Sequence, residues 1–359
     1  MKKIVLTGGG TAGHVTPNIA LLPALQAAGY EIAYVGSYEG IEKKLIADFN
    51  IPYTGISTGK FRRYLDPKNF SDPFRVIKGF VEARNYLKNY QPDVVFSKGG
   101  FVSVPVVRAA ASLHIPCIIH ESDMTPGLAN KLCIPVAEKV CCNFPETMKN
   151  IPADKAVLTG SPIRAELAQG SKLAGLNMCG FTANKPVIMV IGGSLGAANV
   201  NKAVRDALPK LLEDFQVVHL CGKDKIDNLL LNTPGYKQFE YIKSELKDIF
   251  AMADVVISRA GANAICELLA LKKPNILIPL PAASSRGDQL LNAASFEAQS
   301  YSIVLNEDDI TTNLLVDKVH ELYFNRQNYV EAMSRSHQMD AVNTIMSLIN
   351  EAANKSHTQ

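Results

Sequence analysis

The chain has 359 residues, a formal net charge of +3 and ordinary proportions of charged and apolar residues. This length suits two α/β domains, each with its own core, and the small charge argues against a dedicated nucleic-acid-binding protein. The apolar segment after Met1 is too short for a signal peptide, and Arg108 and His114 interrupt the best candidate for a membrane span. The seven cysteines lack metal-type spacing, which predicts buried thiols in a reducing compartment.

Short apolar runs alternate with helical stretches, which predicts parallel sheets covered by helices on both faces. The expected strands are 3–7, 31–35, 53–56, 94–97, 117–120, 139–142, 187–191, 216–220, 239–242, 255–258 and 275–279. The predicted fold is therefore α/β, with two doubly wound Rossmann-like lobes facing a cleft. We expect an N-terminal lobe of residues 1–162 and a C-terminal lobe of residues 163–340. A helical tail from Tyr329 to Ala353 follows, and we expect its last part, about 341–359, to pack back on the first lobe.

The same glycine turn occurs twice, each time after a strand and before a helix. The first reads Gly9-Gly10-Thr11-Ala12-Gly13, and the second reads Gly192-Gly193-Ser194-Leu195-Gly196. Such turns present backbone N–H groups to anions.

The first turn also fits the dinucleotide fingerprint, which needs an acidic residue at the end of the second strand to hold a ribose. Here that strand ends at Ser37, and Glu39 and Glu42 come later, on what looks like the next helix. An NAD oxidoreductase is therefore an alternative that the spacing does not favour.

Other polar residues also follow predicted strands, where ligands bind in parallel sheets. His14 comes directly after the first turn, where it could accept a proton from a hydroxyl or simply pack. His120 and Glu121 end a strand, but Met124 stands where a zinc motif needs its second histidine. Glu121 and Asp123 could bind sugar hydroxyls or cap the next helix.

The stretch from Ser258 to Glu267 predicts a strand, a small-residue turn and a helix. Its turn could hold a phosphate, and Glu267 could hold the two hydroxyls of a ribose. Asp288 and Gln289 follow the next strand and could contact a sugar. Arg164 could bind a diphosphate or form a salt bridge between the lobes. Because no Asp-x-Asp occurs, we expect helix N-termini and arginine, without a metal or other cofactor, to carry the diphosphate charge.

Taken together, these motifs resemble the MurG family of glycosyltransferases over nearly the whole chain. The resemblance rests on Gly9–His14, Lys98–Phe101, His120-Glu121 with Gly127-x-x-Asn130-Lys131, Gly160–Arg164, Gly192–Ala197 and Ser258–Glu267. It implies a GT-B architecture and inverting transfer of N-acetylglucosamine from UDP-N-acetylglucosamine to the 4-hydroxyl of undecaprenyl-diphosphate-linked muramyl-pentapeptide, in peptidoglycan synthesis. The chain departs from the family at Ser122-Asp123, often Gln-Asn, at Ser161, often Asn, and at Leu195, often Gln.

The resemblance also implies roles for individual residues. His14 is the candidate catalytic base, with Glu121 as the alternative. The implied donor-binding residues are Thr11, Gly13, Arg164, Ser194, Ile242, Ser258, Ala262, Glu267, Asp288 and Gln289. The implied acceptor-binding residues are Gly9, Gly10, Thr11, Gly99, Gly100, Asp123 and Asn130.

A lipid-linked acceptor would account for the segment 60–88, which has eight basic residues against three acidic ones, interleaved with aromatic residues. This composition suits an anionic bilayer, and the expected membrane residues are Arg62, Arg63, Phe70, Phe74, Arg75 and Lys78. Ile77 and Val81 are expected to pack on the sheet instead. The implied location is peripheral, at the cytoplasmic face of the bacterial cell membrane. A nucleotide-sugar 2-epimerase and a non-catalytic nucleotide-sugar-binding protein remain alternatives.

Overall fold

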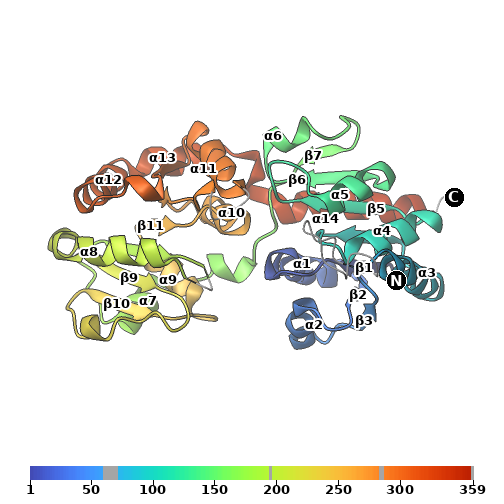
Figure 1. Ribbon diagram of the computed structural model, residues 1–359, viewed down its shortest axis with the longest axis horizontal. Coiled ribbons are helices and arrows are strands. Elements are labelled where there is room, and N and C mark those ends of the chain that lie inside the picture. Colours follow the sequence, from blue (N-terminus) through green and yellow to red (C-terminus); the bar gives the residue numbers. More distant parts are fainter. Residues whose placement is uncertain (60–71, 194–195, 283–286, 357–359) are drawn as a thin grey trace. The chain divides into compact units, whose positions relative to one another are not determined.

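The structure is a computed structural model that describes residues 1–59, 72–193, 196–282 and 287–356 (Figure 1). The chain forms two compact units, one made of Met1–Arg164 with Asp340–Gln359 and the other of Ala165–Met339. Each unit is a parallel sheet with helices on both faces, as the alternation of apolar runs and helical stretches predicts. No helix in the described ranges is long and apolar enough to cross a bilayer.

The first unit contains a sheet of order β3-β2-β1-β4-β5-β6-β7. Its strands are β1 (Lys3–Thr7), β2 (Glu31–Ser37), β3 (Tyr53–Ile56), β4 (Val94–Ser97), β5 (Cys117–Glu121), β6 (Lys139–Cys142) and β7 (Ala156–Leu158). Thr7 pairs with Val35 on one side and with Ser97 on the other, so these three strands end at the same edge. The loops that follow β1, β2 and β4 therefore lie next to one another.

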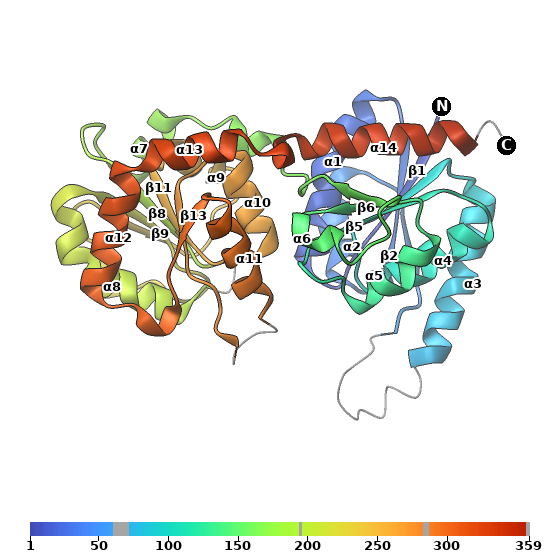
Figure 2. The same cartoon turned by 90° about the horizontal axis from the view of Figure 1, so that it is seen from above.

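Both faces of this sheet are covered by apolar side chains. The helices are α1 (Thr16–Ala27), α2 (Ile41–Ile46), α3 (Asp72–Tyr90), α4 (Ser103–Ser112), α5 (Leu128–Cys133), α6 (Pro145–Met148) and α14 (Ala341–Ser356). Because side chains alternate along a strand, Val5 packs in one core with Leu87, while Ile4 and Leu6 pack in the other with Ile349. Figure 2 shows α14 running beside α1 on this second face.

The second unit contains a sheet of order β10-β9-β8-β11-β12-β13. Its strands are β8 (Val187–Ile191), β9 (Gln216–Leu220), β10 (Tyr236–Phe239), β11 (Val255–Ser258), β12 (Asn275–Leu277) and β13 (Ser302–Val304). Its helices are α7 (Lys172–Cys179), α8 (Ala198–Asp214), α9 (Leu246–Met252), α10 (Ala262–Ala270), α11 (Asp288–Ala298), α12 (Thr312–Phe324) and α13 (Arg326–Ser334).

Three expectations about elements are wrong. The strand expected at 239–242 lies at Tyr236–Phe239. Gly235 turns the chain with φ +77°, and its carbonyl accepts the N–H of Val217 in β9. Pairing with β9 therefore begins earlier in the chain than expected. The three-residue strands β7 and β13 were not expected. The tail is not one helix, because a 3-10 turn (His337–Asp340) separates α13 from α14. There the hydroxyl of Ser336 accepts the N–H of Gln338, a local bond that competes with helix continuation.

The repeat between the units extends beyond the glycines to a buried asparagine, five residues after the last glycine of each turn. Asn18 in α1 donates to the carbonyl of Thr7 at 3.0 Å. Asn201 in α8 donates to the carbonyl of Cys221 at 2.8 Å. In each unit this amide fastens the helix that follows the turn to the carboxyl end of the sheet.

Candidate functional site

The first glycine turn packs against the loop that follows β4. The N–H of Gly9 donates to the carbonyl of Gly99 at 3.3 Å. Gly10 has φ +85°, a conformation that favours glycine. A Cβ on Gly100 would collide with the carbonyl of Gly9 and lie 3.1 Å from Nδ1 of His14. The structure thus brings four of the expected acceptor residues, Gly9, Gly10, Gly99 and Gly100, together with His14.

His14 is held by its own turn. Its Nδ1 lies 3.0 Å from the carbonyl oxygen of Gly9 and 3.2 Å from the hydroxyl of Thr11. Because a carbonyl oxygen only accepts, neutral His14 carries its proton on Nδ1, which leaves the Nε2 lone pair for another partner. Burial and the nearby Lys98 ammonium lower the pKa of His14, against the opposing effects of the Gly9 bond and the Glu42 charge. The imidazole is therefore neutral at pH 7.

A carboxylate that the sequence analysis did not assign lies beside this turn. Glu42, in α2, is fully buried, and its Oε2 accepts the N–H of Gly10 at 3.1 Å. Its Oε1 accepts the N–H of Ser37 at 2.9 Å and also the Ser37 hydroxyl. Burial opposes ionisation, but these bonds outweigh it and hold the pKa of Glu42 below its ordinary value. The sequence signal was only an acid a few residues beyond β2.

Glu121 organises the loop after β5. Its Oε1 accepts the N–H of Asp123 at 2.9 Å, and its Oε2 accepts the N–H of Gly127 at 3.0 Å and the amide of Asn130 at 2.8 Å. The residue is only 3% exposed. Both carboxylate oxygens therefore hold the loop that carries Asp123 and the start of α5.

Two buried basic residues connect the neighbouring strand ends. Lys98 lies directly after β4, and its ammonium donates a hydrogen bond to the hydroxyl of Ser122. Ser122 is one of the positions that depart from the family pattern. Nε2 of His120 donates to the carbonyl of Gly160 at 2.9 Å. Burial and the Lys98 charge hold the pKa of His120 well below its ordinary value, so this histidine is neutral.

In the second unit, the repeated turn follows β8. Gly193 has φ +86°, and apart from Gly193 and its chain neighbours no atom of the described residues lies within 4 Å of the place where its Cβ would be. Gly196 has φ +68°, and a Cβ there would collide with the carbonyl of Cys221 and lie 3.0 Å from Cδ of Lys225. Ser194, an expected donor residue, lies outside the described residues.

The turn between β11 and α10, with its flanking elements, holds three of the other expected donor residues, Ser258, Ala262 and Glu267. Ser258 is buried, and Ala262 begins α10 after Gly261, which supplies no capping side chain. Around the Cβ position of Gly261, the described atoms leave open space. Glu267 is half-buried in the second turn of α10. The first turn of α10 therefore offers backbone N–H groups and, further along, a carboxylate.

Helix α11 is fastened to this turn. Asn292 donates its amide to the carbonyl of Ala260 at 3.1 Å, and Oε1 of Gln289 accepts the N–H of Leu280 at 3.1 Å. Asp288 is the first residue of α11. These bonds place Asp288 and Gln289 at the same end of the second sheet as Ser258.

An ion pair that the sequence analysis missed, between Arg259 and Glu307, connects the turn after β11 with the start of α8. The Arg259 guanidinium pairs with Glu307 and donates to the carbonyls of Ile278 at 3.0 Å and Pro279 at 3.2 Å. The other oxygen of Glu307 accepts the amide of Asn199, the second residue of α8. Only a fold that brings the loop after β13 over these strand ends makes this contact, so no local motif signals it.

Two further expected donor residues lie elsewhere in their own units. Arg164 is half-buried and is the last residue of the first unit's main segment. Ile242 is buried in the loop between β10 and α9.

The expected membrane segment is described only from α3 onward, so Arg62, Arg63 and Phe70 lie outside the described residues. Phe74, Arg75 and Lys78 are exposed on α3. The expectation that Ile77 and Val81 pack on the sheet is wrong, since they are 62% and 50% exposed.

The reason for this exposure is the helix face that α3 turns to the sheet. The helix packs through Ala83 and Leu87 and approaches the carbonyl of Ser57 at Gly79, where a Cβ would collide. With 3.6 residues per turn, Phe74, Ile77 and Val81 lie on the opposite face. The exposed face of α3 is therefore both apolar and basic.

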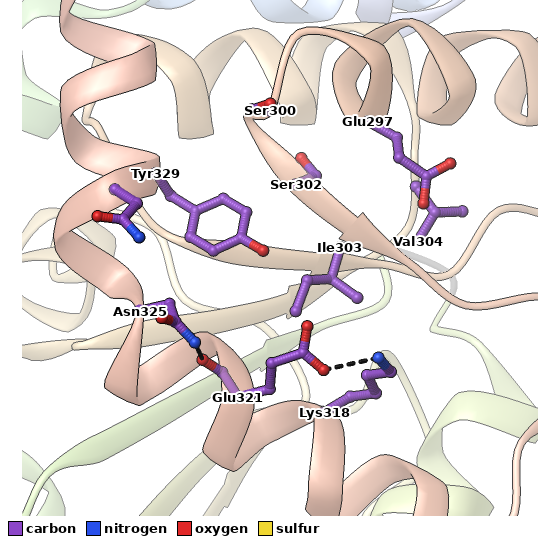
Figure 3. Close-up of a pocket in the computed structure, with 10 residues that line it drawn as sticks. Glu297, Ser300, Ser302, Ile303, Val304, Lys318, Glu321, Asn325 and Tyr329 are labelled. Carbon is purple, nitrogen blue, oxygen red and sulfur yellow. Dashed lines mark hydrogen bonds and ion pairs between the residues drawn. The ribbon is translucent and has the colours of Figure 1, made fainter.

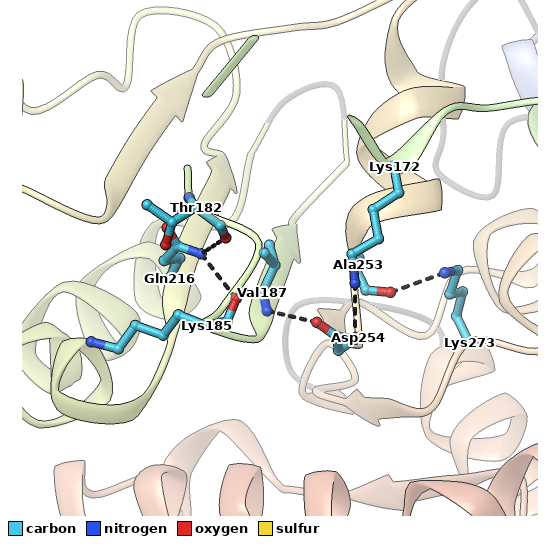
Figure 4. Close-up of polar contacts among 8 residues, drawn as sticks. All are labelled: Lys172, Thr182, Lys185, Val187, Gln216, Ala253, Asp254 and Lys273. Atoms are coloured by element: carbon cyan, nitrogen blue, oxygen red, sulfur yellow. Dashed lines mark hydrogen bonds and ion pairs between the residues drawn. The ribbon is translucent and has the colours of Figure 1, made fainter. Parts of the chain in front are cut away.

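Other polar contacts lie at the amino ends of the second unit's strands, away from the expected site residues. Figure 4 shows Asp254 accepting the N–H of Val187 at 2.8 Å, and Lys273 donating to the carbonyl of Ala253 at 2.9 Å.

A hollow of about 490 Å³ near β13 is lined by polar residues such as Glu297, Lys318 and Glu321 (Figure 3). None of the expected site residues lines it.

Among the described residues, no group of three or more His, Cys, Asp or Glu side chains could hold a metal ion. All seven cysteines are buried, and none forms a disulfide. Burial raises the pKa of Cys133 to about 12, so this thiol is unreactive.

Two doubly wound units, each with a glycine turn at the carboxyl end of its parallel strands, form the architecture of the GT-B glycosyltransferases. The N-terminal and C-terminal domain models of glycosyltransferase family 28 match residues 4–142 and 187–349. The chain belongs to this family.

A relative from Lachnospira eligens, named UDP-N-acetylglucosamine–N-acetylmuramyl-(pentapeptide) pyrophosphoryl-undecaprenol N-acetylglucosamine transferase, is 64% identical over 98% of this chain and 99% of its own. The crystal structure of Acinetobacter baumannii MurG superposes with a TM-score of 0.77 at 28% identity, covering 98% of this chain and 100% of that one. The structure of a UDP-N-acetylglucosamine 2-epimerase from Methanocaldococcus jannaschii has a TM-score of 0.68 at 14% identity, covering 98% of this chain and 100% of that one, and shares the fold alone.

Proposed function

We propose that this chain moves N-acetylglucosamine from UDP-N-acetylglucosamine to the 4-hydroxyl of undecaprenyl-diphosphate-linked N-acetylmuramyl-pentapeptide, with inversion at the transferred carbon. The observation that carries the proposal is membership of family 28, with 64% identity over nearly full length to a relative named for this reaction. The epimerase alternative has only the common fold in its favour.

The second unit would bind the donor. The first turn of α10, after Gly261, offers backbone N–H groups beside open space, which suits a diphosphate. Glu267, further along α10, would take both ribose hydroxyls as charge-assisted hydrogen bonds. Backbone groups near Ile242 would form hydrogen bonds with the uracil, while Asp288 and Gln289 would contact the sugar.

The first unit would bind the acceptor at the glycines around His14. The 4-hydroxyl oxygen attacks C1 of the donor sugar, its proton passes to Nε2 of His14, and the bond from C1 to the diphosphate oxygen breaks to release UDP. The bond from Nδ1 to Gly9 supports this role, because it leaves Nε2 ready to accept. Glu121 is the weaker candidate, since both its oxygens already accept N–H groups of its own loop.

The exposed face of α3 would hold the protein at the cytoplasmic surface of the membrane that carries the acceptor. Phe74, Ile77 and Val81 would insert among the lipids, and Arg75 and Lys78 would meet anionic headgroups. Buried cysteines without disulfides fit the reducing compartment on that side of the membrane.

The experiment is incubation with radiolabelled UDP-N-acetylglucosamine, with and without a short-chain lipid-linked acceptor analogue. We expect label in the lipid only with the acceptor, together with stoichiometric UDP. A labelled 2-epimer formed without acceptor would identify an epimerase, and binding without any conversion would identify a binding protein.

His14→Ala should keep UDP binding and lower kcat by about 10²–10⁴-fold, the usual contribution of a general base. An effect confined to the KM for the acceptor would make His14 a binding residue instead.

A further inference from the structure

The peptide group between Gly9 and Gly10 is hydrogen-bonded on both sides. Its N–H, which belongs to Gly10, donates to Oε2 of Glu42 at 3.1 Å. Its C=O, which belongs to Gly9, lies 3.0 Å from Nδ1 of His14. In a trans peptide the C=O and N–H point in opposite directions. One rigid planar group therefore connects a buried carboxylate to the imidazole.

The pocket for this carboxylate is built from glycines. A Cβ on Gly9 would lie 2.5 Å from Cδ of Glu42, and Cβ atoms on Gly36 and Gly40 would also collide with the Glu42 side chain. At these three glycines the backbone thus approaches the Glu42 side chain more closely than a residue with a Cβ would allow. The hydrogen bonds from Ser37 hold the second oxygen, so Glu42 has little freedom to leave Gly10.

We propose that Glu42 is a positioning residue for the reaction, acting on His14 through the Gly9–Gly10 peptide. The inference rests on the proposed role of His14 as the base. A carboxylate that accepts the N–H of a peptide polarises it and makes its carbonyl a stronger acceptor. The carbonyl in turn fixes the Nδ1–H tautomer and stabilises the imidazolium that forms when Nε2 takes the proton. An aspartate does this by direct contact in other His-dependent enzymes.

Two charged groups from other elements face His14: Glu42 from α2 and Lys98 at the end of β4. The cation disfavours protonation of the imidazole and the carboxylate favours it. Removal of the carboxylate charge should therefore weaken the base and make its protonation occur at lower pH.

The first test needs no variant. Histidines labelled with ¹⁵N in the wild-type protein report the tautomer of each imidazole by NMR, and His14→Ala assigns the signal of His14. The proposal requires neutral His14 to carry its proton on Nδ1. A proton on Nε2 overturns it, whether or not His14 is the base.

The second test compares Glu42→Gln with Glu39→Gln, which removes an exposed carboxylate in the loop just before α2. In Glu42→Gln we expect a lower NMR pKa for His14, an acid limb of the kcat/KM profile at lower pH, and kcat reduced roughly 10- to 100-fold, part of a general base's contribution. The KM for the donor should stay unchanged, and Glu39→Gln should match wild type in every measurement.

Loss of activity in Glu42→Gln with an unchanged pKa for His14 would make Glu42 merely structural and refute the proposal. Full activity of His14→Ala would instead refute the proposed base, whatever the NMR results.

Discussion

The exposed face of α3 provides the sharpest quantitative prediction. We expect the triple substitution Phe74→Ser, Ile77→Ser and Val81→Ser to weaken binding to anionic vesicles while the protein stays folded. These side chains are 75%, 62% and 50% exposed, so they contribute little to the core. Serine has a helix propensity close to those of the residues it replaces. The change should therefore act on lipid contact and not on α3 itself.

The magnitude follows from the exposed fractions. Burial of a whole large apolar side chain contributes about 1.5–3 kcal/mol, and the three exposed parts amount to roughly two such side chains. A helix lying in the interface inserts only one side, so we expect to lose about half of the total, or roughly 2 kcal/mol. That corresponds to an approximately 30-fold weaker partition coefficient.

The basic residues should contribute separately and with a different salt dependence. Each contributes about 1 kcal/mol near an anionic surface and is screened by salt. Lys78 lies 3.7 Å from Glu82, which offsets part of its charge, whereas the structure gives Arg75 no such ion pair among the described residues. Arg75→Gln should therefore weaken binding at low salt more than Lys78→Gln. The triple serine variant should lose the affinity that remains at high salt.

The assay is co-sedimentation with vesicles of phosphatidylglycerol and phosphatidylcholine across a salt series. Phe324→Ser is the matched control, because Phe324 is 74% exposed but lies in the second unit, on α12. Turnover of a water-soluble acceptor analogue should be unchanged in every variant. If the triple variant binds vesicles as tightly as Phe324→Ser, the face of α3 does not contact the membrane.

Three other outcomes are expected. Glu267→Ala should raise the KM for the donor about 10- to 100-fold, since a charge-assisted hydrogen bond contributes roughly 1.5–3 kcal/mol; an unchanged KM in steady-state kinetics would remove Glu267 from the site. Glu307→Ala should lower the free energy of unfolding by about 3–5 kcal/mol, because it leaves the buried Arg259 guanidinium without its carboxylate; a denaturation midpoint equal to wild type would contradict this. Activity should persist in excess EDTA, and loss of turnover that magnesium or manganese restores would show that a metal is required.

The sequence predicted the sheets well because parallel strands buried on both faces are continuous apolar runs. It failed where that signal is weak or local. The short strand β13 owes its place to the neighbouring β12 and not to its own composition. Ile77 and Val81 look like core residues by type, but the packing of Gly79, Ala83 and Leu87 determines which face of α3 meets the sheet.

The candidate site was predictable where a residue ends a strand, as Glu121 and Ser258 do, or stands in the turn after one, as His14 does. Glu42 and Glu307 were missed because Gly10 and Arg259, the partners that connect them to the site, are distant in sequence, and an isolated acid is usually solvated. What distinguishes Glu42 is the set of glycines that make room for it. Those glycines could be read from the sequence, but the turn and the acid could be connected only in three dimensions.

The two glycine turns began as one motif in the sequence, yet their surroundings differ in charge. Beside the first, a buried carboxylate occupies the N–H of Gly10, and the residue after the last glycine is His14. Beside the second, the side chain of Lys225 packs near Gly196, and the corresponding residue is Ala197. A carboxylate disfavours an anion at its turn and favours a base, whereas a lysine favours an anion. The same glycine turn can thus support proton transfer in one unit and diphosphate binding in the other.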